Sequence, residues 1–595
     1  MTLSPDNEDS PPAGTAASTA ARIGGVVAGG LGLLLLAASV AWWVGESEWG
    51  RYQQRTPEQA FADGTFGLEL APLKYILVSS RLSAAAFELP DHRPWPQRFG
   101  FLSRSTPAAG SCEADAPGNL PVGFSVSHRL PGNATPVPVR FVGLTCAACH
   151  AASIGSGAPI LGVGSQTADV IGFSDAFLNA VLDANLTADA ILDAYDQQCP
   201  PQGIGLLVKG QRLIERFFID SWLQGARAAA RSNASKYDQP FHGAQIGDPA
   251  NIPTGPSRTR PFRSVVRNTL DLPGENNHAY SKVPLAALQA DKVWSQFDGS
   301  IGKPVVRSLI AVFTSGASIA ALNERQIADD VVQAADYTLR LGLEPRLPTL
   351  AQAFPTLPVP ALATLERGRA VYLQHCDGCH GHPEPGGWVM PPGLPVPSIA
   401  PLKDIGTDPA RLEFRYADML PVALATTLPA RDIGPQLAAL EQKAAQAASA
   451  GALAEADWWT RAIAALQERA RVYPTGHRMA FAVDEIARRD GFENAPIPFA
   501  WLRAPYLHNA SVPTLRALIG LDERPALFCR GQEGYDPVAI GTRVVLPPHG
   551  GTCPPEAPFL FDAGQPGNSN GGHIYPPRGT GSDDLEALLA YIGTL

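Results

Sequence analysis

The most apolar stretch of the chain lies near its N-terminus. Residues 23–44 read IGGVVAGGLGLLLLAASVAWWV and carry no charge. A helix of this length crosses a bilayer, and the two tryptophans at its far end suit a membrane interface. We therefore predict a single-pass anchor at residues 23–45 after a cytoplasmic tail at residues 1–22. A cleaved signal peptide is the alternative, because the small residues 39–41 fit a cleavage site.

Apolar residues recur at helical spacing in several later segments. This spacing predicts helices over residues 173–195, 205–230 and 310–339, with Ser174 or Asp175 as the cap of the first. Each of these segments keeps polar residues between the apolar ones. We therefore expect helices with one buried face.

Proline and alanine set the pattern of the second half. Repeated prolines at residues 345–364 prevent a continuous helix, so we predict a linker there and a helix at residues 365–376 directly after it. The Ala-rich residues 434–473 predict an inserted pair of helices that breaks near Ala450 and Gly451. The insertion carries no pattern of metal ligands.

Residues 46–140 lack strong periodicity and are rich in turn signals, which predicts an irregular wrapping layer. The fold class that these patterns predict is mostly α with extensive irregular loops. At 595 residues and 45% hydrophobic content, the chain can form two or more cores. Its 56 acidic residues outnumber 46 basic ones, so we expect no nucleic-acid partner.

Two short motifs carry most of the chemistry. Residues 146–150 read CAACH and residues 376–380 read CDGCH. A C-x-x-C-H run attaches c-type haem through its two thiols, and its histidine ligates the iron. A redox pair or a zinc site would not require the trailing histidine. We predict two covalently bound c-type haems, with attachment through Cys146, Cys149, Cys376 and Cys379 and with His150 and His380 as iron ligands.

The two motifs divide the chain into two cytochrome c-like haem domains. We predict an N-terminal domain with wrapping loops at residues 46–345 and a C-terminal domain at residues 346–595, which contains the insertion at 434–473. Similar bacterial cytochromes acquire c-type haem on the outer face of the plasma membrane. The bulk of the chain is therefore expected on the periplasmic side of the inner membrane, or free in the periplasm or secreted if the N-terminus is cleaved.

The remaining four cysteines would lie in an oxidising compartment, where disulfides persist. Four cysteines allow three pairings, and the sequence does not choose among them. The short, Gly- and Pro-rich loop between Cys529 and Cys553 favours that pair, which leaves Cys112 for Cys199. Free buried thiols are the alternative.

The second axial ligand of each haem decides its function. Two strong ligands make an electron-transfer site, whereas an open position reacts with oxygen or peroxide. Met390, Met419 and Met479 all follow the second motif, and Met419 lies at the usual distance for a small cytochrome c. His573, near the C-terminus, is the competing ligand.

Several stretches resemble one known family. They read FVGLTCAACH, LERGRAVYLQHCDGCH, RAPYLHNASVPTLRALIG, GYDPVAIGTRV and FLFDAGQPGNSNGGHIY. Together they are similar to the dihaem cytochrome c peroxidase superfamily, and specifically to its rubber-oxygenase-like branch, from about residue 95 to the end. The resemblance implies that His573 ligates the C-terminal haem opposite His380. It also implies that the N-terminal haem keeps its distal side open.

The resemblance further implies aromatic residues at the haems. Trp294 or Phe297 corresponds to a bridge between the haems, and Phe313 corresponds to a group over the reactive haem. Relatives usually show Trp where this chain has Phe297, and an aromatic stripe is more often core. His508 lies in another shared motif, where Ala510 replaces a usual Gly; a structural role is favoured over ligation.

Three functions follow from these readings. The first is a dioxygenase acting on an apolar alkene such as polyisoprene or an unsaturated fatty acid, and the second is a hydrogen peroxide reductase fed by a small cytochrome donor. The third is a non-catalytic membrane-anchored electron carrier. We predict a periplasmic dihaem oxidoreductase that uses O2 or H2O2 at the N-terminal haem, with the C-terminal bis-histidine haem as an electron reservoir.

Overall fold

The computed structural model describes most of the chain beyond residue 51. The described ranges are 52–83, 95–104, 116–132, 134–154, 157–238, 253–260, 278–287, 292–302, 304–322, 324–342, 347–392, 398–412, 434–453, 489–548 and 551–595, with a few single residues between them. The predicted tail and anchor at residues 1–45 lie outside them, as do Met419 and Met479. In the part that is described, no helix is both long and apolar enough to cross a membrane.

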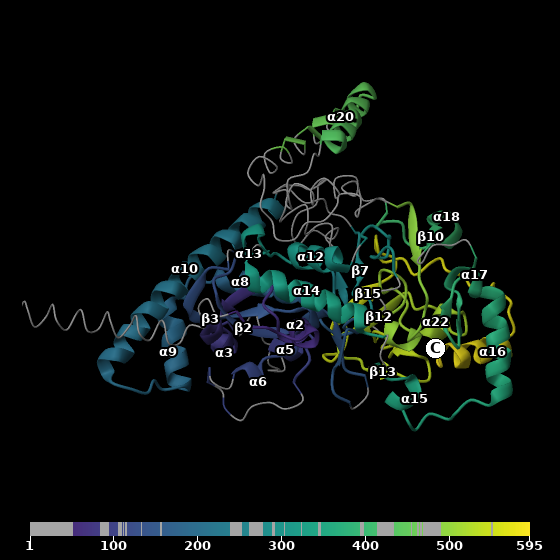
Figure 1. Cartoon of the computed structure of the whole chain (residues 1–595), viewed down its shortest axis with the longest axis horizontal. Helices are drawn as coiled ribbons and strands as arrows, with labels where there is room; N and C mark the ends of the chain where they lie inside the picture. The colour runs from purple at the N-terminus through teal and green to yellow at the C-terminus, as the bar shows by residue number, and fades with distance from the viewer. Residues whose placement is uncertain are drawn as a thin grey trace, which may run out of the picture.

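The fold is mixed rather than mostly α, so that prediction was wrong. Helices account for 42% of the described residues and strands for 14%. Most strands pair over two to four residues, too short to leave an alternating pattern in the sequence. In Figure 1 the N-terminal segments lie left of centre and the C-terminal segments lie on the right.

The region predicted as irregular, residues 46–140, contributes most of a three-stranded antiparallel sheet in the order β1-β3-β2, and β3 continues beyond it to Leu144. The strands are β1 (Glu69–Pro72), β2 (Phe124–Arg129) and β3 (Pro136–Leu144). The central strand β3 begins with two prolines, which argue against a central strand. Its pairing with β1 covers only residues 141–143, beyond those prolines. The two prolines argued against a strand in the sequence, but they lie outside the part of β3 that pairs on both sides.

Helices of the first half pack around this sheet. α2 (Pro57–Asp63) begins with a capping box of Thr56 and Gln59, and α3 (Leu73–Leu82) follows β1 directly. The helix predicted at 173–195 is two helices, α8 (Val170–Val181) and α9 (Ala188–Gln198). The caps are Asp169 and Thr187, not Ser174 or Asp175, because their side chains accept from the first-turn N–H groups of Gly172 and Ala190.

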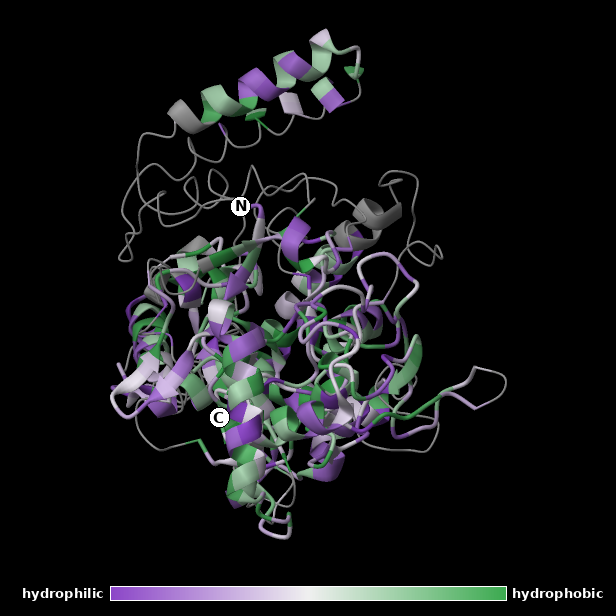
Figure 2. Ribbon diagram, turned by 90° about the vertical axis from the view of Figure 1, so that its right-hand side faces the viewer, coloured by the Kyte–Doolittle hydropathy of each residue, from purple (hydrophilic) through white to green (hydrophobic). Residues whose placement is uncertain are grey.

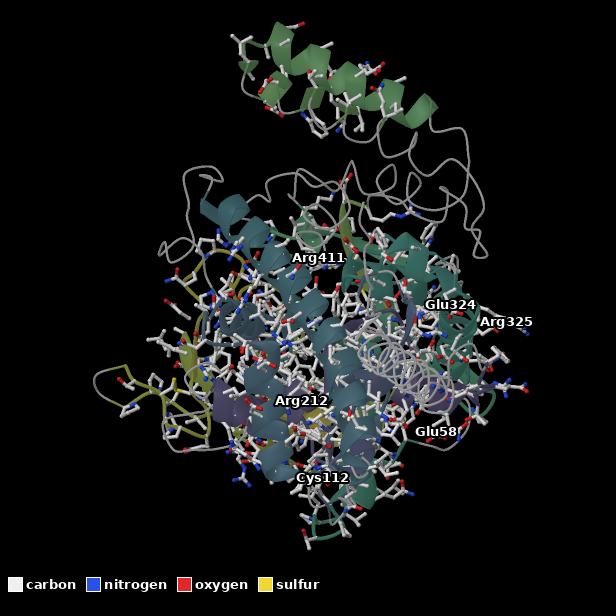
Figure 3. All side chains as sticks on the ribbon, turned by 90° about the vertical axis from the view of Figure 1, so that its left-hand side faces the viewer. Glu58, Cys112, Arg212, Glu324, Arg325 and Arg411 are labelled. Atoms are coloured by element: carbon white, nitrogen blue, oxygen red, sulfur yellow. A yellow bond between two sulfur atoms is a disulfide. The ribbon has the colours of Figure 1, made fainter. Side chains whose placement is uncertain are left out.

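The other helix predictions fare better. α10 (Gly205–Asp238) contains the segment predicted at 205–230. The pattern over 310–339 corresponds to α12 (Pro304–Thr314), α13 (Ile319–Leu322) and α14 (Arg325–Arg340). α9 and α10 are joined by ion pairs from Arg212 to Asp193 and Asp196, and Arg212 lies near the centre of the face shown in Figure 3.

The second half is built on two packed helices. α16 (Leu362–His375) runs into the second motif as predicted, and it packs against α23 (Ser582–Ile592). At their crossing a Cβ on Gly368 would lie 2.0 Å from the Ala587 carbonyl oxygen, so only glycine allows this approach. α20 (Gly434–Ser449) ends just before the predicted break, where Gly451 has φ 77°.

Shorter elements complete the described part. The helices are α5 (Trp95–Arg98), α6 (Ala116–Asn119), α7 (Cys146–Cys149), α15 (Leu350–Ala353), α17 (Asp377–His380), α18 (Leu402–Ile405), η3 (Ala500–Arg503) and α22 (Leu515–Leu518). The strand pairs are β4 (Ala151–Ala152) with β5 (Ile160–Leu161), β6 (Arg258–Thr259) with β7 (Ser281–Lys282), β8 (His382–Glu384) with β9 (Gly387–Val389), β10 (Ser398–Pro401) with β11 (Gly491–Asn494), β12 (Leu527–Arg530) with β15 (Phe559–Asp562), and β13 (Tyr535–Asp536) with β14 (Gly541–Thr542).

One hydrophobic core contains residues from both predicted haem domains. Phe61 and Ala147 come from the first half, and Tyr372, Trp501 and Leu588 from the second. A further core lies between the sheet and the helices α3, α8, α9 and α10. Figure 2 shows hydrophobic and hydrophilic residues alternating along the helices, as expected when one face is buried.

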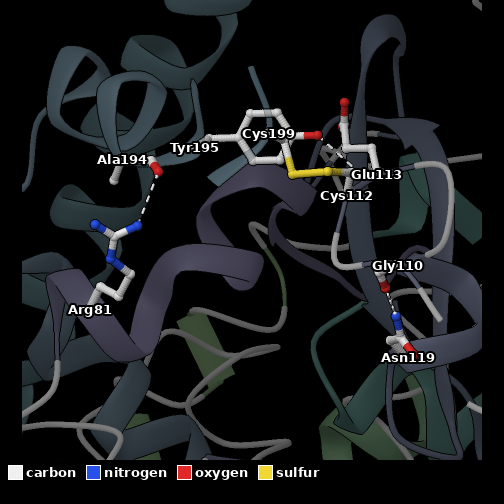
Figure 4. Close-up of a disulfide and its surroundings, with 8 residues drawn as sticks. All are labelled: Arg81, Gly110, Cys112, Glu113, Asn119, Ala194, Tyr195 and Cys199. Carbon is white, nitrogen blue, oxygen red and sulfur yellow. Dashed lines mark hydrogen bonds between the residues drawn. A yellow bond between two sulfur atoms is a disulfide. The ribbon is translucent and has the colours of Figure 1, made fainter. Parts of the chain in front are cut away.

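Both favoured disulfides are confirmed. Cys112 bonds to Cys199, and Cys529 bonds to Cys553. Figure 4 shows the first bond beside the end of α9, where the Glu113 backbone N–H donates to the Tyr195 hydroxyl. The second disulfide ties β12 to the loop before β15. The described chain is thus cross-linked once in each half.

Candidate haem sites

The first motif is partly buried, because Cys146, Cys149 and His150 each keep some exposed surface. Its cysteines form the single turn α7 between β3 and β4, and the two alanines between them, Ala147 and Ala148, are 1% and 4% exposed. Gly123 approaches this turn so closely that a Cβ there would lie 1.9 Å from the Ala148 nitrogen. Its φ of 85° also favours glycine. The turn is therefore held by close backbone packing.

His150 is oriented by the backbone. Its Nδ1 donates to the Pro284 carbonyl at 3.1 Å, which leaves Nε2 as the free ligand atom. Its own carbonyl accepts from the Gly162 N–H at 2.7 Å. The ring of Phe61 lies 6.4 Å from the imidazole, and Tyr337 lies 4.7 Å beyond Phe61. Burial lowers the pKa of His150 to about 4, so the ring is neutral, as a ligand must be.

The motif cysteines lie in surroundings that favour neutral sulfur. Burial raises the pKa of Cys146 to about 12 and that of Cys149 to about 11, and it raises the pKa of Cys376 to about 12. A thiolate ligand of a metal needs the opposite shift. A thioether carries no charge, so this burial suits covalent attachment better than thiolate coordination.

The second motif lies nearer the surface. Its turn α17 contains no buried residue, and Cys379 is exposed. The Nδ1 of His380 donates to the Ala495 carbonyl at 2.8 Å, which again leaves Nε2 free. Tyr372 donates its hydroxyl to the Gly381 carbonyl at 2.7 Å, directly after His380. The imidazole of His380 thus has the same kind of support as His150.

His573 faces His380. The two ring centres are 6.2 Å apart, with planes inclined by 47°. Two imidazoles on opposite sides of one iron would have ring centres about 6 Å apart, given about 2 Å per metal–nitrogen bond and about 1 Å from each nitrogen to its ring centre. Burial first, then the charges of His380 and Arg524, lower the pKa of His573 to about 4. The pair fits a bis-histidine haem.

The loop that carries His573 is closely fixed. Its backbone N–H donates to the Ile405 carbonyl at 2.7 Å, and φ at His573 is 47°. A Cβ on the preceding Gly572 would lie 2.3 Å from Gly406, so glycine is required there. Arg524 donates to the carbonyls of Gly572 and His573 at 2.7 and 3.1 Å. The left-handed turn therefore presents the imidazole in one direction.

His508 takes a different place. Its ring stacks on Phe492 at 4.3 Å, and its carbonyl accepts from the Lys282 N–H at 2.7 Å. Burial, followed by the positive charges of Arg411 and Lys282, lowers its pKa to about 3. Among the described residues, the ring that contacts His380 is that of His573, not that of His508. This geometry supports the structural reading of His508.

The aromatic residues predicted at the haems occupy three environments. Trp294 lies under the guanidinium of Arg489, 4.1 Å from the ring centre. Phe297 lies 5.8 Å from the ammonium of Lys282. Phe313, in α12, is buried in the core that also contains Phe61 and Ala147. The structure therefore places Phe313 in the shared hydrophobic core and Phe297 beside β7, while their catalytic roles stay predictions.

The competing methionine ligands are only partly described. Met390 lies beside Gly381, where a Cβ would approach its sulfur to 2.8 Å. Met419, the methionine predicted at the usual distance, lies outside the described residues. Of the candidate ligands that are described, His573 is the one whose ring faces His380.

Sequence reasoning missed the groups that hold the imidazoles. The acceptors are backbone carbonyls of Pro284 and Ala495, which carry no sequence signal because every residue has one. Lys282 and Phe61 were also missed, since a lone lysine and a lone phenylalanine belong to no motif. In the described chain, no group of three or more His, Cys, Asp or Glu forms a further metal cluster.

Residues 491–529 match a family model described as RoxA-like, cytochrome c-like. This segment contains Ala495, Arg503 and His508. The chain therefore has a cytochrome c-like domain, and such a domain implies a c-type haem.

Two similar proteins have names that state no activity. The uncharacterized protein y4iJ of Sinorhizobium fredii (strain NBRC 101917 / NGR234) is 26% identical over 557 residues, which cover 84% of this chain and 84% of that protein. The uncharacterized protein y4iM of the same strain is 40% identical over 75 residues, covering 12% of this chain and 17% of that protein.

Proposed function

We propose that this protein is a dihaem c-type cytochrome oxidoreductase of the dihaem peroxidase superfamily, with O2 or H2O2 as its oxidant. One haem is held by Cys146, Cys149 and His150, and the other by Cys376, Cys379, His380 and His573. The observation that carries the proposal is the contrast between the two motif histidines. The imidazole of His573 lies 6.2 Å from His380, whereas the ring contact of His150 is with the apolar Phe61, 6.4 Å away.

Bound at these positions, a haem supplies an iron that exchanges single electrons and, where one axial position is open, reacts with oxygen or peroxide. The residues around His150 prepare such a position. The Nδ1–H bond to Pro284 fixes the ring, while the buried Ala147, Ala148 and Phe61 give the motif apolar neighbours. An apolar surrounding of this kind supports an apolar co-substrate, such as an alkene or an unsaturated fatty acid.

The C-terminal site is suited to storing and passing electrons. His380 and His573 would hold the iron from its two sides, and the motif lies near the surface, where Cys379 is exposed. A small cytochrome donor would reach this edge more easily than the N-terminal motif. Because saturated ligation at a surface site is also what an electron carrier needs, non-catalytic electron transfer is the second candidate function.

The compartment is part of the proposal. Two disulfides support an oxidising environment, since such bonds persist outside the cytoplasm. The uncharged run at residues 23–44 supports a single-pass anchor that tethers the haem domains on the periplasmic side of the inner membrane.

Oxygen uptake by the purified, haem-loaded protein tests this proposal. We expect uptake with polyisoprene or an unsaturated fatty acid and no added reductant, matched by oxidised product. The paired variants Cys146→Ala/Cys149→Ala and Cys376→Ala/Cys379→Ala each lack one attachment site, and uptake should depend on the first site directly. If no uptake occurs, peroxide reduction with a reduced small cytochrome is measured; failure of both leaves the electron carrier.

A further inference from the structure

Lys282, the last residue of β7, is a buried lysine whose ammonium forms no ion pair among the described residues. Its ammonium donates to the carbonyls of Arg503 at 2.6 Å and Pro505 at 2.8 Å. The rings of Phe297 and Tyr506 each lie 5.8 Å from Nζ. Burial first, then the charge of Arg503, lowers the pKa of Lys282 to about 7. A cation buried at such a cost is a candidate for a role beyond stability.

On one side, Lys282 is close in the chain to the carbonyl group that accepts the hydrogen bond of His150. Two residues further along the chain, the Pro284 carbonyl accepts the Nδ1–H of His150 at 3.1 Å. The segment is fixed there, because the Ala286 N–H donates to the Gly162 carbonyl at 2.8 Å and the Gly162 N–H donates to the His150 carbonyl at 2.7 Å. The Pro284 carbonyl is therefore held between β7 on one side and Gly162 on the other.

On the other side, Arg503, whose carbonyl accepts from Lys282, is connected to the backbone segment that accepts the hydrogen bond of His380. The Arg503 guanidinium donates to the carbonyls of Pro496 and Pro498, at 3.1 Å in each case. Pro496 follows Ala495, whose carbonyl accepts the Nδ1–H of His380 at 2.8 Å. A continuous series of hydrogen bonds and short backbone segments thus joins the two imidazoles through the ammonium.

We propose that Lys282 is a positioning residue that holds the backbone supports of His150 and His380 in one hydrogen-bonded unit. The proposal rests on the proposed function, because it requires a haem at each histidine. A histidine that donates a stronger Nδ1–H bond is a more basic iron ligand. One side chain between the two supports therefore sets ligand strength at both haems together.

The test is Lys282→Met in the full-length, haem-loaded chain. Methionine fills similar space but donates no hydrogen bond. We expect the iron–histidine stretching band of the reduced N-terminal haem, in resonance Raman spectra, to move to lower frequency, because a weaker Nδ1–H bond makes a less basic ligand. In the same variant, the low-spin electron paramagnetic resonance signal of the C-terminal haem should broaden, because His380 is held less firmly.

Two further variants separate this role from charge and from folding. Lys209→Met, at an exposed position of α10, removes the same charge away from the network and should leave both signals unchanged. Lys282→Gln keeps N–H donors without the charge, so its shifts should be smaller than those of Lys282→Met. Losing the donor leaves two carbonyls unpaired but also removes a buried charge, so both variants should fold.

The outcomes are distinct. Unchanged signals at both haems in Lys282→Met and Lys282→Gln would overturn the proposal, and so would a change confined to one haem. A haem count below two in the wild-type protein would instead defeat the proposed function. If the N-terminal haem proved six-coordinate, the reactive-site assignment would fail, while the low-spin signals of both haems would still test Lys282.

Discussion

The two C-x-x-C-H motifs share a turn and a hydrogen-bonding scheme but differ in their surroundings. In the first motif, the intervening alanines are buried, and the structure packs Phe61 near the histidine. In the second, Asp377 and Gly378 leave the turn α17 without a buried residue, and His573 faces the histidine. The first motif therefore has a buried centre between partly exposed cysteines, whereas the second lies nearer the surface with a second imidazole beside it.

This difference shows how one protein could use c-type haem in two roles, one reactive and one for electron transfer. The imidazole support is equal in the two sites, since each Nδ1–H donates to a backbone carbonyl. What differs is access and the opposite axial position. Under the proposed function, the N-terminal site at His150 would react with O2 or H2O2, and the C-terminal site at His380 would exchange electrons.

Among the variants that test the difference between the two haem sites, His573→Ala should have the largest effect. Removing the imidazole should convert the C-terminal haem from low spin to high spin, because one strong axial ligand is lost. Visible and electron paramagnetic resonance spectra of the oxidised protein measure this. His508→Phe is the matched control, because it keeps a ring against Phe492 and should retain the low-spin signal. An unchanged spectrum in His573→Ala would sink the assignment of this ligand.

Much of the local chemistry could be predicted from the sequence, because it resides in contiguous motifs. The attachment turns, the helix before the second motif and the short Cys529–Cys553 loop were all visible as patterns. The position of His573 came from a resemblance, and the structure places its ring opposite His380.

The rest could not be predicted, for physical reasons that specific residues illustrate. The acceptors at Pro284 and Ala495 are backbone atoms, which no side-chain pattern reveals. The strand β3 contains Pro136 and Pro138 outside its three-stranded part, so its own composition argued against it. The break between α8 and α9 follows from the Thr187 cap, whereas the apolar spacing continued across it.

A second effect concerns pH and the buried imidazole of His508. Burial lowers the pKa of His508 to about 3, against about 6.5 in an unfolded chain. The unfolded state therefore binds a proton first as pH falls. The stability from this group is complete above about pH 6.5 and is lost progressively toward about pH 3, by at most about 1.4 kcal/mol per pH unit.

His508→Phe removes this titration and sharpens the comparison. Denaturant midpoints followed at the haem absorbance, at about pH 6 and about pH 5, should fall less in the variant than in the wild type, by the equivalent of about 1 kcal/mol. Lys282 and Arg411 face the imidazole and contribute to the shift. Equal pH slopes for the two proteins would show that His508 is not held neutral.

The smallest effect tests whether the two sites are supported independently. Tyr372→Phe and Thr145→Val each remove one hydroxyl that donates to a carbonyl close to a motif, to Gly381 at 2.7 Å and to Ala62 at 2.8 Å. Each loss should lower the free energy of unfolding by about 1 kcal/mol, since a buried or partly buried carbonyl loses its partner. The spectral change should stay local, at the C-terminal haem for Tyr372→Phe and at the N-terminal haem for Thr145→Val. If either variant altered both haems, the sites would be coupled through their attachment turns as well, and the Lys282 network would not be the sole described connection between them.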